Sequence, residues 1–274
     1  MAARPKSEDV GPVVAPVHIS RVPVFEPTFK RPYRSENEEF RTSRGVVRVN
    51  GKLTATHRKI LDAIFAEALH TEDMGEDGPM VVVVDPFSVA KTAGVSRHHP
   101  KWLRGKLDEM QSATVELTRL KNGIPGDRFW GQIISEVRES DDFRVALPGG
   151  AFVGDRALWE VTISAVWMRL YDTDLVVRYA LLLPEINQLA HGATHAFALH
   201  VLSHRRHTRY IDDILRDVGA LRDGMTRVAQ EAVRQSIREE AAALKRLGIH
   251  LVLGGTGELR VDYSQHPQVR FKNP

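Results

Sequence analysis

The stretch DPFSVAKTAGVSRHHPKWLRGKLDEMQSATVELTRLKNGIPGDRFWGQIISEVR (residues 85–138) decides the fold that we expect for this chain. Asp85 is a candidate helix N-cap, and Pro86 suits the first helical position, where its missing N–H costs nothing. Gly94 tolerates the left-handed backbone of a tight turn, so it ends this short helix. A second helix follows, and the two together predict a helix-turn-helix.

The second helix begins at Ser96 or His99, and it is basic before its first acidic residue. Its inward face has the spacing i, i+4, i+7 and consists of Leu103, Leu107 and Met110. Strand 114–120 then alternates, a turn begins at Lys121, and strand 129–138 returns. This order predicts a winged helix, which places a basic helix in the major groove of DNA. The alternative is a generic α+β domain with a polar hairpin.

A first domain over residues 51–150 contains this winged helix. Thr54 or Thr56 caps a preceding helix whose apolar residues follow helical spacing. Residues 80–84 form a short strand that is rich in β-branched residues, as expected of a buried strand. The helix, the buried strand and the helix-turn-helix thus precede the hairpin in the order of a winged-helix domain.

Residues 155–264 repeat the plan, which predicts a second winged-helix domain. A strand at 158–163 enters it, and a helix-turn-helix leads into a long helix at about 226–247. The buried face of that helix consists of Ala229, Val233, Ile237, Ala241 and Leu244. Strands 249–253 and 258–263 close the domain as a second hairpin.

The two ends of the chain lack such patterns. Residues 1–50 are rich in proline and lack helical periodicity, so we expect a flexible, Pro-rich and basic arm. That arm is either a solvated tail or a segment that touches DNA or a partner. Residues 265–274 are expected to be a C-terminal tail. The predicted fold class is α+β, with two tandem winged-helix domains preceded by a largely disordered N-terminal arm.

The amino-acid composition limits the classes of protein to which this chain can belong. The chain of 274 residues is 42% hydrophobic and 27% charged, which is ordinary for a folded soluble protein. It has no cysteine, which excludes disulfides and thiolate-ligated metal sites. We expect a cytoplasmic, DNA-associated protein without membrane contact, because no apolar run approaches the roughly 18 residues of a membrane span and no signal-peptide core occurs. The net charge is only +3, but the sequence pI is about 9.2 and the basic residues are clustered.

The candidate DNA-binding residues lie on the predicted second helices, on the hairpins and in the basic cluster at 204–210. In the first domain they are Ser96, Arg97, Lys101, Arg104, Lys106, Arg119, Lys121 and Arg128. In the second domain they are Arg205, Arg206, Arg209, Thr226, Arg227, Arg234, Arg238, Lys245 and Arg260. Arginine suits bidentate contacts to guanine, although a solvated charged helix face is the alternative for the long helix.

No catalytic or cofactor site is predicted. His191, His195, His200 and His204 include i, i+4 pairs, but no His-Glu-x-x-His pattern occurs, so no metal is expected. The run 210–213 (YIDD) is similar to a two-metal catalytic motif, but it continues into a helical period instead of a β-hairpin. No phosphate-binding loop occurs either, and we expect a protein that is not an enzyme.

Three segments carry a resemblance to a known family. They are THRKILDAIF (56–65), DPFSVAKTAGVSR (85–97) and LLLPEINQLAHGATHAFALHVLSHRRH (181–207). Over roughly 45–264 the chain resembles plasmid replication initiator proteins of the TrfA kind. The resemblance implies tandem winged helices that bind repeated sites in a plasmid origin, open the neighbouring DNA and recruit host replication proteins. The Gln-x-x-Leu-Phe type of segment that some of these initiators use to hold the sliding clamp is not evident here.

Two functions therefore stand as hypotheses. The first is a sequence-specific, origin-binding replication initiator whose partners are double-stranded DNA, host replication proteins such as a helicase or initiator, and a second copy of the chain in a homodimer. The second is a winged-helix transcriptional regulator with one DNA-reading and one dimerisation domain. Binding to directly repeated sites favours the first, and binding to a single palindrome favours the second.

Overall fold

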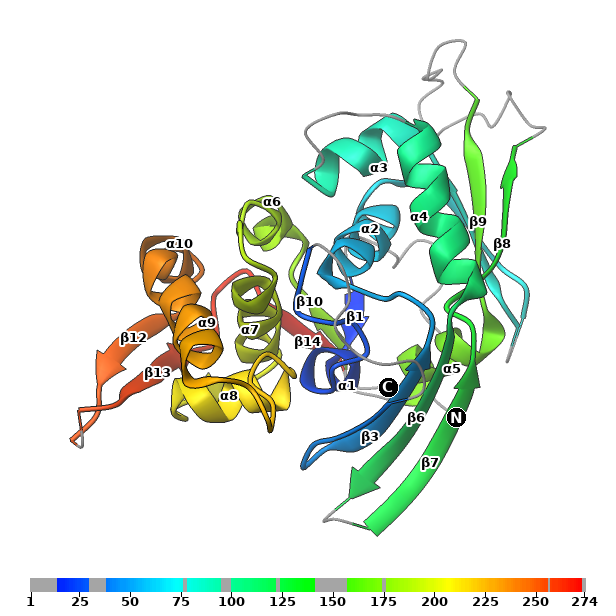
Figure 1. Cartoon of the computed structure of the whole chain (residues 1–274). Helices are drawn as coiled ribbons and strands as arrows, with labels where there is room; N and C mark the ends of the chain where they lie inside the picture. Colours follow the sequence, from blue (N-terminus) through cyan, green and yellow to red (C-terminus); the bar gives the residue numbers. More distant parts are fainter. Residues whose placement is uncertain are drawn as a thin grey trace.

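The computed structural model describes residues 14–29, 38–75, 78–94, 100–121, 124–140, 157–173, 176–255 and 257–272 (Figure 1). The described residues form four antiparallel sheets and two hydrophobic cores, one for each of two units. The predicted α+β class with two tandem winged-helix units is confirmed. No described helix has both the length and the apolar character needed to span a membrane.

The first helix-turn-helix forms as the local signals predict. Helix α3 (Pro86–Thr92) begins after Asp85, whose Oδ1 accepts a 3.0 Å hydrogen bond from the Phe87 N–H. Gly94 follows with a φ of +75°, which suits glycine in a tight turn. Helix α4 (Pro100–Ser112) buries Leu103, Leu107 and Met110. The predicted start of this helix at Ser96 or His99 lies outside the described residues.

Two sheets flank these helices and helix α2 (Ala55–Ala66). One sheet has the order β2-β3-β6-β7, and its strands are β2 (Glu39–Arg41), β3 (Gly45–Asn50), β6 (Thr114–Lys121) and β7 (Ile124–Gly131). The other has the order β4-β5-β9-β8, and its strands are β4 (Ala68–Asp73), β5 (Met80–Val84), β9 (Trp159–Ile163) and β8 (Ile134–Glu139). The hairpin β6–β7 is the predicted wing.

The predicted strand 129–138 and the predicted start of the second domain at residue 155 are both wrong. The return strand divides into β7 and β8, which belong to different sheets. Strand β9 pairs with β5 and β8 of the first unit, not with the second. Helix α5 (Ala165–Thr173) follows it and buries Trp167 in the first core. Alternation along a strand shows which face is buried, but it does not identify the partner strand.

The second unit contains the predicted helix-turn-helix and wing. Its strands and helices up to the turn are β10 (Val176–Arg178), the 3-10 helix η2 (Ala180–Leu182), α6 (Leu183–Asn187), α7 (Gly192–Leu202), β11 (Arg206–His207) and α8 (Ile211–Asp217). After the turn come α9 (Arg227–Glu239), α10 (Ala241–Arg246), β12 (His250–Leu253), β13 (Leu259–Ser264) and β14 (Arg270–Lys272). Hairpin β12–β13 is the second wing, and β11 pairs with β13 beside it.

The predicted single helix at 226–247 is two helices. Glu240 interrupts it with φ −98° and ψ 12°. Its carboxylate accepts hydrogen bonds from the backbone N–H groups of Ala190 (2.6 Å) and His191 (3.3 Å). The predicted inward face is present all the same, because Ile237 and Leu244 are fully buried. The break therefore lets one acidic residue hold the chain segment that precedes α7.

The prediction of a flexible arm is also wrong for its described residues. Strand β1 (Val14–Pro16) pairs with β10, helix α1 (Val17–Arg21) follows it, and Phe25 joins the first core. The expected C-terminal tail contributes β14, which pairs with the other edge of β10. Both ends of the chain thus complete one three-stranded sheet, which no local pattern reveals.

The two units are joined by a buried domain interface, which is formed by Arg58, Lys59 and Asp62 of α2 together with Tyr179 and Asn187. Beside it, Asn187 Nδ2 donates to the carbonyl oxygen of the half-buried Thr92 at 2.7 Å. Arg58 donates to the Tyr179 hydroxyl (2.8 Å) and to Asp62 Oδ1 (3.0 Å). Lys59 Nζ donates to the carbonyl oxygens of Asn187 (2.6 Å) and Leu189 (3.2 Å). Burial opposes the charge on Arg58, but Asp62 and Tyr179 outweigh it and raise its pKa. These contacts fix one winged helix against the other.

Candidate nucleic-acid interface

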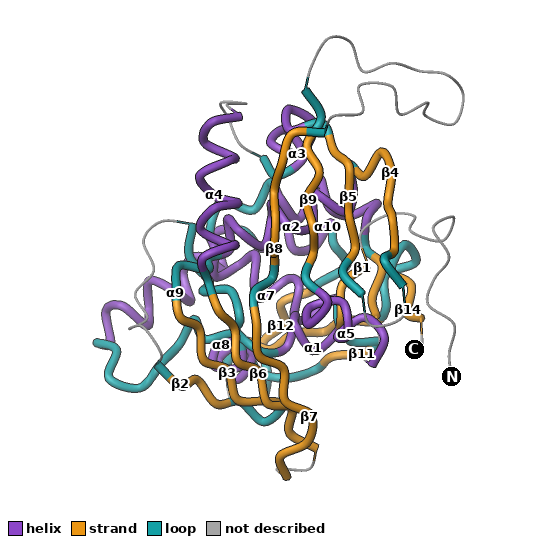
Figure 2. The backbone as a smooth tube through the Cα atoms, turned by 90° about the vertical axis from the view of Figure 1, so that its right-hand side faces the viewer, coloured by secondary structure: helices purple, strands orange, loops and turns teal. Residues whose placement is uncertain are grey.

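The second helices of the two helix-turn-helix motifs, α4 and α9, lie on the same side of the molecule. Figure 2 shows both helices along its left-hand side, which is the side facing the viewer in Figure 1. The strand β14 lies on the opposite side of Figure 2. A protein that reads DNA with two helices needs both of them to face one duplex. The described structure places both helices on one side, which is the arrangement that such reading would need.

The basic residues of α4 differ in whether a neighbouring carboxylate forms an ion pair with them. Lys101 is exposed and has no ion-pair partner among the described residues. Arg104 Nε donates to Asp108 Oδ1 at 3.0 Å. Lys106 Nζ lies 2.9 Å from Glu109 Oε1. The predicted contacts Ser96 and Arg97 lie outside the described residues. Lys101 is therefore the described residue of α4 that is best placed to contact phosphate.

The outer face of the first wing mixes charge with one large aromatic side chain. Arg128 is exposed and pairs with Glu116 on the neighbouring strand at 3.0 Å. Arg119 lies on the inner face instead, over the ring of the buried Phe129, with 5.0 Å from Cζ to the ring centroid. Trp130 is 66% exposed beside Arg128. The side chain of Lys121 lies outside the described part of the chain.

The start of α9 presents an uncompensated cation and an exposed apolar side chain. Thr226 caps the helix, since its Oγ1 accepts the Ala229 N–H at 3.2 Å. Arg227 is exposed and has no described ion-pair partner. Val228 is 81% exposed. In DNA-binding helix-turn-helix proteins the N-terminal residues of the second helix contact base edges, so Arg227 and Val228 are the positions of α9 to test first.

Arg234 and Arg238 are both predicted DNA contacts, but their environments differ. Arg234 makes a bidentate contact with Asp212 of α8. Its Nε donates to Oδ1 at 2.9 Å, and its Nη2 donates to Oδ2 at 2.7 Å. This hydrogen bonding lowers the pKa of Asp212 and raises that of Arg234. Arg238 pairs along its own helix with Glu231. Arg234 therefore connects the two helices of the motif, whereas Arg238 stays exposed on α9.

The remaining predicted residues lie around the second wing. Arg206 on β11 and Arg260 on β13 are exposed on the sheet β11-β13-β12. Arg205 lies 5.6 Å over the ring of Phe271, and Arg209 pairs with Asp217. Lys245 is exposed on α10. These side chains come from several elements, namely β11, β13, α10 and the loops beside them, and a spread of cations suits contacts to a nucleic-acid backbone.

Sequence reasoning missed Trp130 and Val228. The signal for Trp130 is the alternation along β7, because Phe129 is buried and its neighbour must point outward. The signal for Val228 is an apolar residue in the polar arc of an amphipathic helix. Each is an exposed apolar side chain on an element expected to approach DNA.

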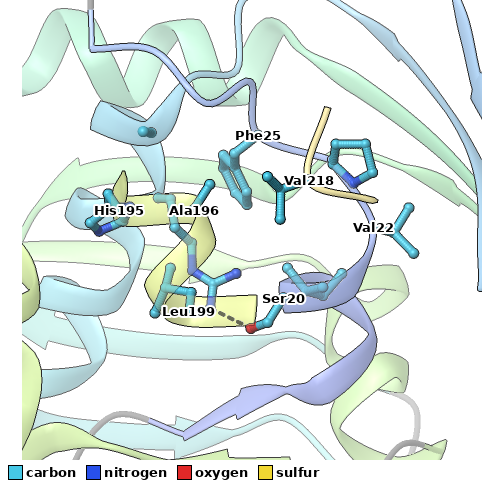
Figure 3. A pocket seen from close by; sticks show the side chains of 11 residues that line it. Ser20, Val22, Phe25, His195, Ala196, Leu199 and Val218 are labelled. Atoms are coloured by element: carbon cyan, nitrogen blue, oxygen red, sulfur yellow. Dashed lines mark hydrogen bonds between the residues drawn. The ribbon is translucent and has the colours of Figure 1, made fainter. Parts of the chain in front are cut away.

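A cavity between the units is too small for an organic ligand. Its volume is about 30 Å³, and its walls come from the N-terminal segment, α2 and α7. Figure 3 shows Ser20, Phe25, His195 and Leu199 around it, and Arg58 lies 3.5 Å from Ser20 Oγ there. Pockets for organic ligands are typically about ten times larger. This cavity belongs to the domain interface.

Comparison with known proteins supports the fold. The chain is similar to the crystal structure of domains 2 and 3 of RctB, with a TM-score of 0.53 and 13% sequence identity. The match covers 93% of this chain and 100% of the RctB chain. No family model matches this chain. No curated protein matches it either. At this identity the likeness concerns the fold alone.

Proposed function

We propose that this chain is a sequence-specific DNA-binding replication initiator that binds repeated origin sites, promotes local opening and recruits host replication proteins. The observation that carries the proposal is the placement of α4 and α9 on one side of the molecule (Figure 2). The fold resembles that of RctB, a replication initiator of Vibrio chromosome II. The sequence resemblance to TrfA-like proteins adds a plasmid origin as the expected setting.

In this proposal some of the exposed side chains contact phosphates and others contact bases. Lys101, Arg128, Arg206 and Arg260 would contact phosphates, which sets the register of the protein and makes affinity sensitive to salt. Arg227 and Val228 would read base edges, since arginine recognises guanine and an apolar group contacts the thymine methyl. The buried interface would hold the two reading helices at a fixed spacing on the duplex, where major-groove faces recur about every 34 Å.

The first experiment selects bound sites from randomised duplex DNA and then compares Lys101→Ala and Arg227→Ala with wild type. Lys101→Ala is expected to lower affinity for all sequences and to reduce the slope of log affinity against log salt by about 1, because it removes a phosphate contact. Arg227→Ala is expected to weaken binding by about 1–3 kcal/mol and to relax the base preference at one position. Arg270→Ala is the matched control, because it removes an exposed cation from β14 on the opposite side. Equal affinity of all four proteins would contradict the assigned face.

The selected site also distinguishes initiation from regulation. Directly repeated sites, together with permanganate-reactive thymines beside them after binding, support the initiator. A single palindromic site without opening would support the transcriptional regulator instead. Pull-down of purified helicase or host initiator by the DNA-bound chain tests recruitment separately, because this step need not share residues with the DNA-binding face.

A further inference from the structure

Three histidines meet where α7 ends and β11 begins. His200 lies in the last turn of α7, His204 follows in the turn, and His207 is on β11. The ring centroids lie 4.9 Å (His200–His204), 5.4 Å (His200–His207) and 4.3 Å (His204–His207) apart. One nitrogen from each ring lies within 4.8 Å of the other two. The sequence spacing H-x₃-H-x₂-H thus becomes a compact cluster.

The cluster contains polar atoms that have no hydrogen-bond partner among the described residues. Both ring nitrogens of His200 and Nε2 of His207 are buried, and no described group donates to them or accepts from them. His200 is 1% exposed, so its nitrogens have lost water as well. His204 differs, because its Nδ1 donates to the His200 carbonyl oxygen at 2.8 Å. Buried polar atoms in folded proteins are almost always satisfied, so several together call for a specific reason.

The rings are held in the neutral form, which is the form that binds metals. Burial lowers the pKa of His204 to about 3 and that of His207 to about 4, and it lowers the pKa of His200 well below its ordinary value. The positive charges of Arg21 and Arg209 act in the same direction. His204 has its Nδ1 committed as a donor, which leaves the lone pair on Nε2 and fixes the ring tautomer.

We propose that His200, His204 and His207 form a binding site for one divalent transition-metal ion of the Zn²⁺ type. Three imidazoles are a frequent ligand set for this ion, with a fourth position left for water or an anion. Nitrogens bound at about 2.0–2.1 Å in a tetrahedron lie roughly 3.3 Å apart, so the ligand nitrogens must approach from within 4.8 Å. The stacked rings of His204 and His207, now 16° from parallel, turn toward a common point when the ion binds.

The neighbouring arginines affect the metal affinity of this site and its fourth ligand. Arg21 is held by Ser203, since its Nε donates to Ser203 Oγ at 3.1 Å. Its charge and that of Arg209 oppose a dication, so the affinity is modest and the fourth ligand is an anion such as hydroxide or chloride. The ion joins the end of α7 to β11, because His200 and His207 lie on these two elements. This role is independent of DNA binding.

The test uses the full chain, freed of metal with a chelator and titrated with Zn²⁺ by calorimetry. We expect one ion per chain and a higher melting temperature with the ion bound. His204→Asn and His207→Asn are each expected to lower the affinity at least about tenfold. His191→Asn and His250→Asn are the matched controls, since both side chains are exposed elsewhere in the second unit. The controls should bind as wild type does.

A second measurement does not depend on any variant folding. Histidine-ring NMR of the wild-type chain should show three of the 12 histidines shifting when Zn²⁺ is added, and Co²⁺ should give absorption bands of a nitrogen-ligated, four-coordinate ion. Absence of Zn²⁺ binding by the wild type overturns the proposal. Binding that persists unchanged in both His204→Asn and His207→Asn, or ring shifts at other histidines, overturns it too.

Discussion

Arg58 on α2 donates a 2.8 Å hydrogen bond to the hydroxyl of Tyr179, 121 positions further along the chain. The same hydroxyl donates to Asp62 Oδ2 at 3.0 Å. One phenol thus bridges the two charges of a buried ion pair and connects the first unit to the second. Because Arg58 and Tyr179 lie in different winged-helix units, this contact helps to fix the position of one unit relative to the other.

Tyr179→Phe should destabilise the protein by about 1–3 kcal/mol, since it leaves Arg58 and Asp62 each short of one buried hydrogen bond. Urea unfolding followed by circular dichroism measures the loss. Tyr210→Phe is the control, because Tyr210 is 39% exposed and its hydroxyl has no hydrogen-bond partner in the described chain. Equal midpoints for the two variants would show that the bridge contributes nothing.

His57 should make the protein sensitive to acid. Its Nδ1 accepts the Thr54 N–H at 3.0 Å, and burial lowers its pKa from 6.5 to about 4, with Lys106 adding to the shift. The unfolded chain takes up this proton near pH 6.5 and the folded chain only near pH 4. Stability therefore falls as pH falls through this window, by roughly 3 kcal/mol for this group.

His57→Gln tests this dependence, because glutamine still accepts the Thr54 N–H and does not titrate. The free energy of unfolding of the variant should fall less steeply between pH 6.5 and 4. Other buried histidines contribute in both proteins, so the difference between the two curves is the quantity to measure. Parallel curves would mean that His57 is protonated at similar pH in both states.

Arg234→Ala should lower stability by about 0.5–1 kcal/mol, because its two-pronged contact with Asp212 joins α8 to α9 but is partly screened by solvent. Arg238→Ala should leave the thermal midpoint unchanged, since the described partners of Arg238, Glu231 and Gln235, lie on its own helix. Thermal unfolding of the two variants side by side checks this difference. A larger loss for Arg238→Ala would contradict the assigned roles.

Gly94→Ala should destabilise more than Gly224→Ala. Both glycines have positive φ, +75° and +81°, so each substitution carries backbone strain of about 1–2 kcal/mol. A Cβ at Gly94 would also lie 3.0 Å from the Asn187 carbonyl oxygen, whereas at Gly224 it would meet nothing within 4 Å. The difference in urea midpoint between the variants reports the fit of the first helix-turn-helix against the second unit.

Val228→Ala should relax base preference at one position of the selected site by ~1 kcal/mol, with little change in overall salt dependence. The side chain is exposed, so the fold should not change. Repeating the site selection with the variant measures the effect. An unchanged preference at every position would place Val228 away from the bases.

Much of the local structure could be predicted from the sequence. The cap at Asp85, the turn at Gly94, the inward face of α4 and the two hairpins all follow from residues a few positions apart. The candidate site could be predicted as two basic helices, but not which cations stay available. Arg227 and Arg234 look alike in the sequence, and only the position of Asp212 on α8 separates them.

The sequence by itself determined the class of fold and its repetition, because caps, turns and amphipathic faces depend on neighbours within about one helical turn. The tertiary structure alone decided that β9 belongs to the first unit, that both chain ends share one sheet, and that α2 joins the units through Tyr179. It also brought three histidines together. These features depend on pairings between distant segments, whose free energy comes from burial and hydrogen bonding that no local pattern specifies.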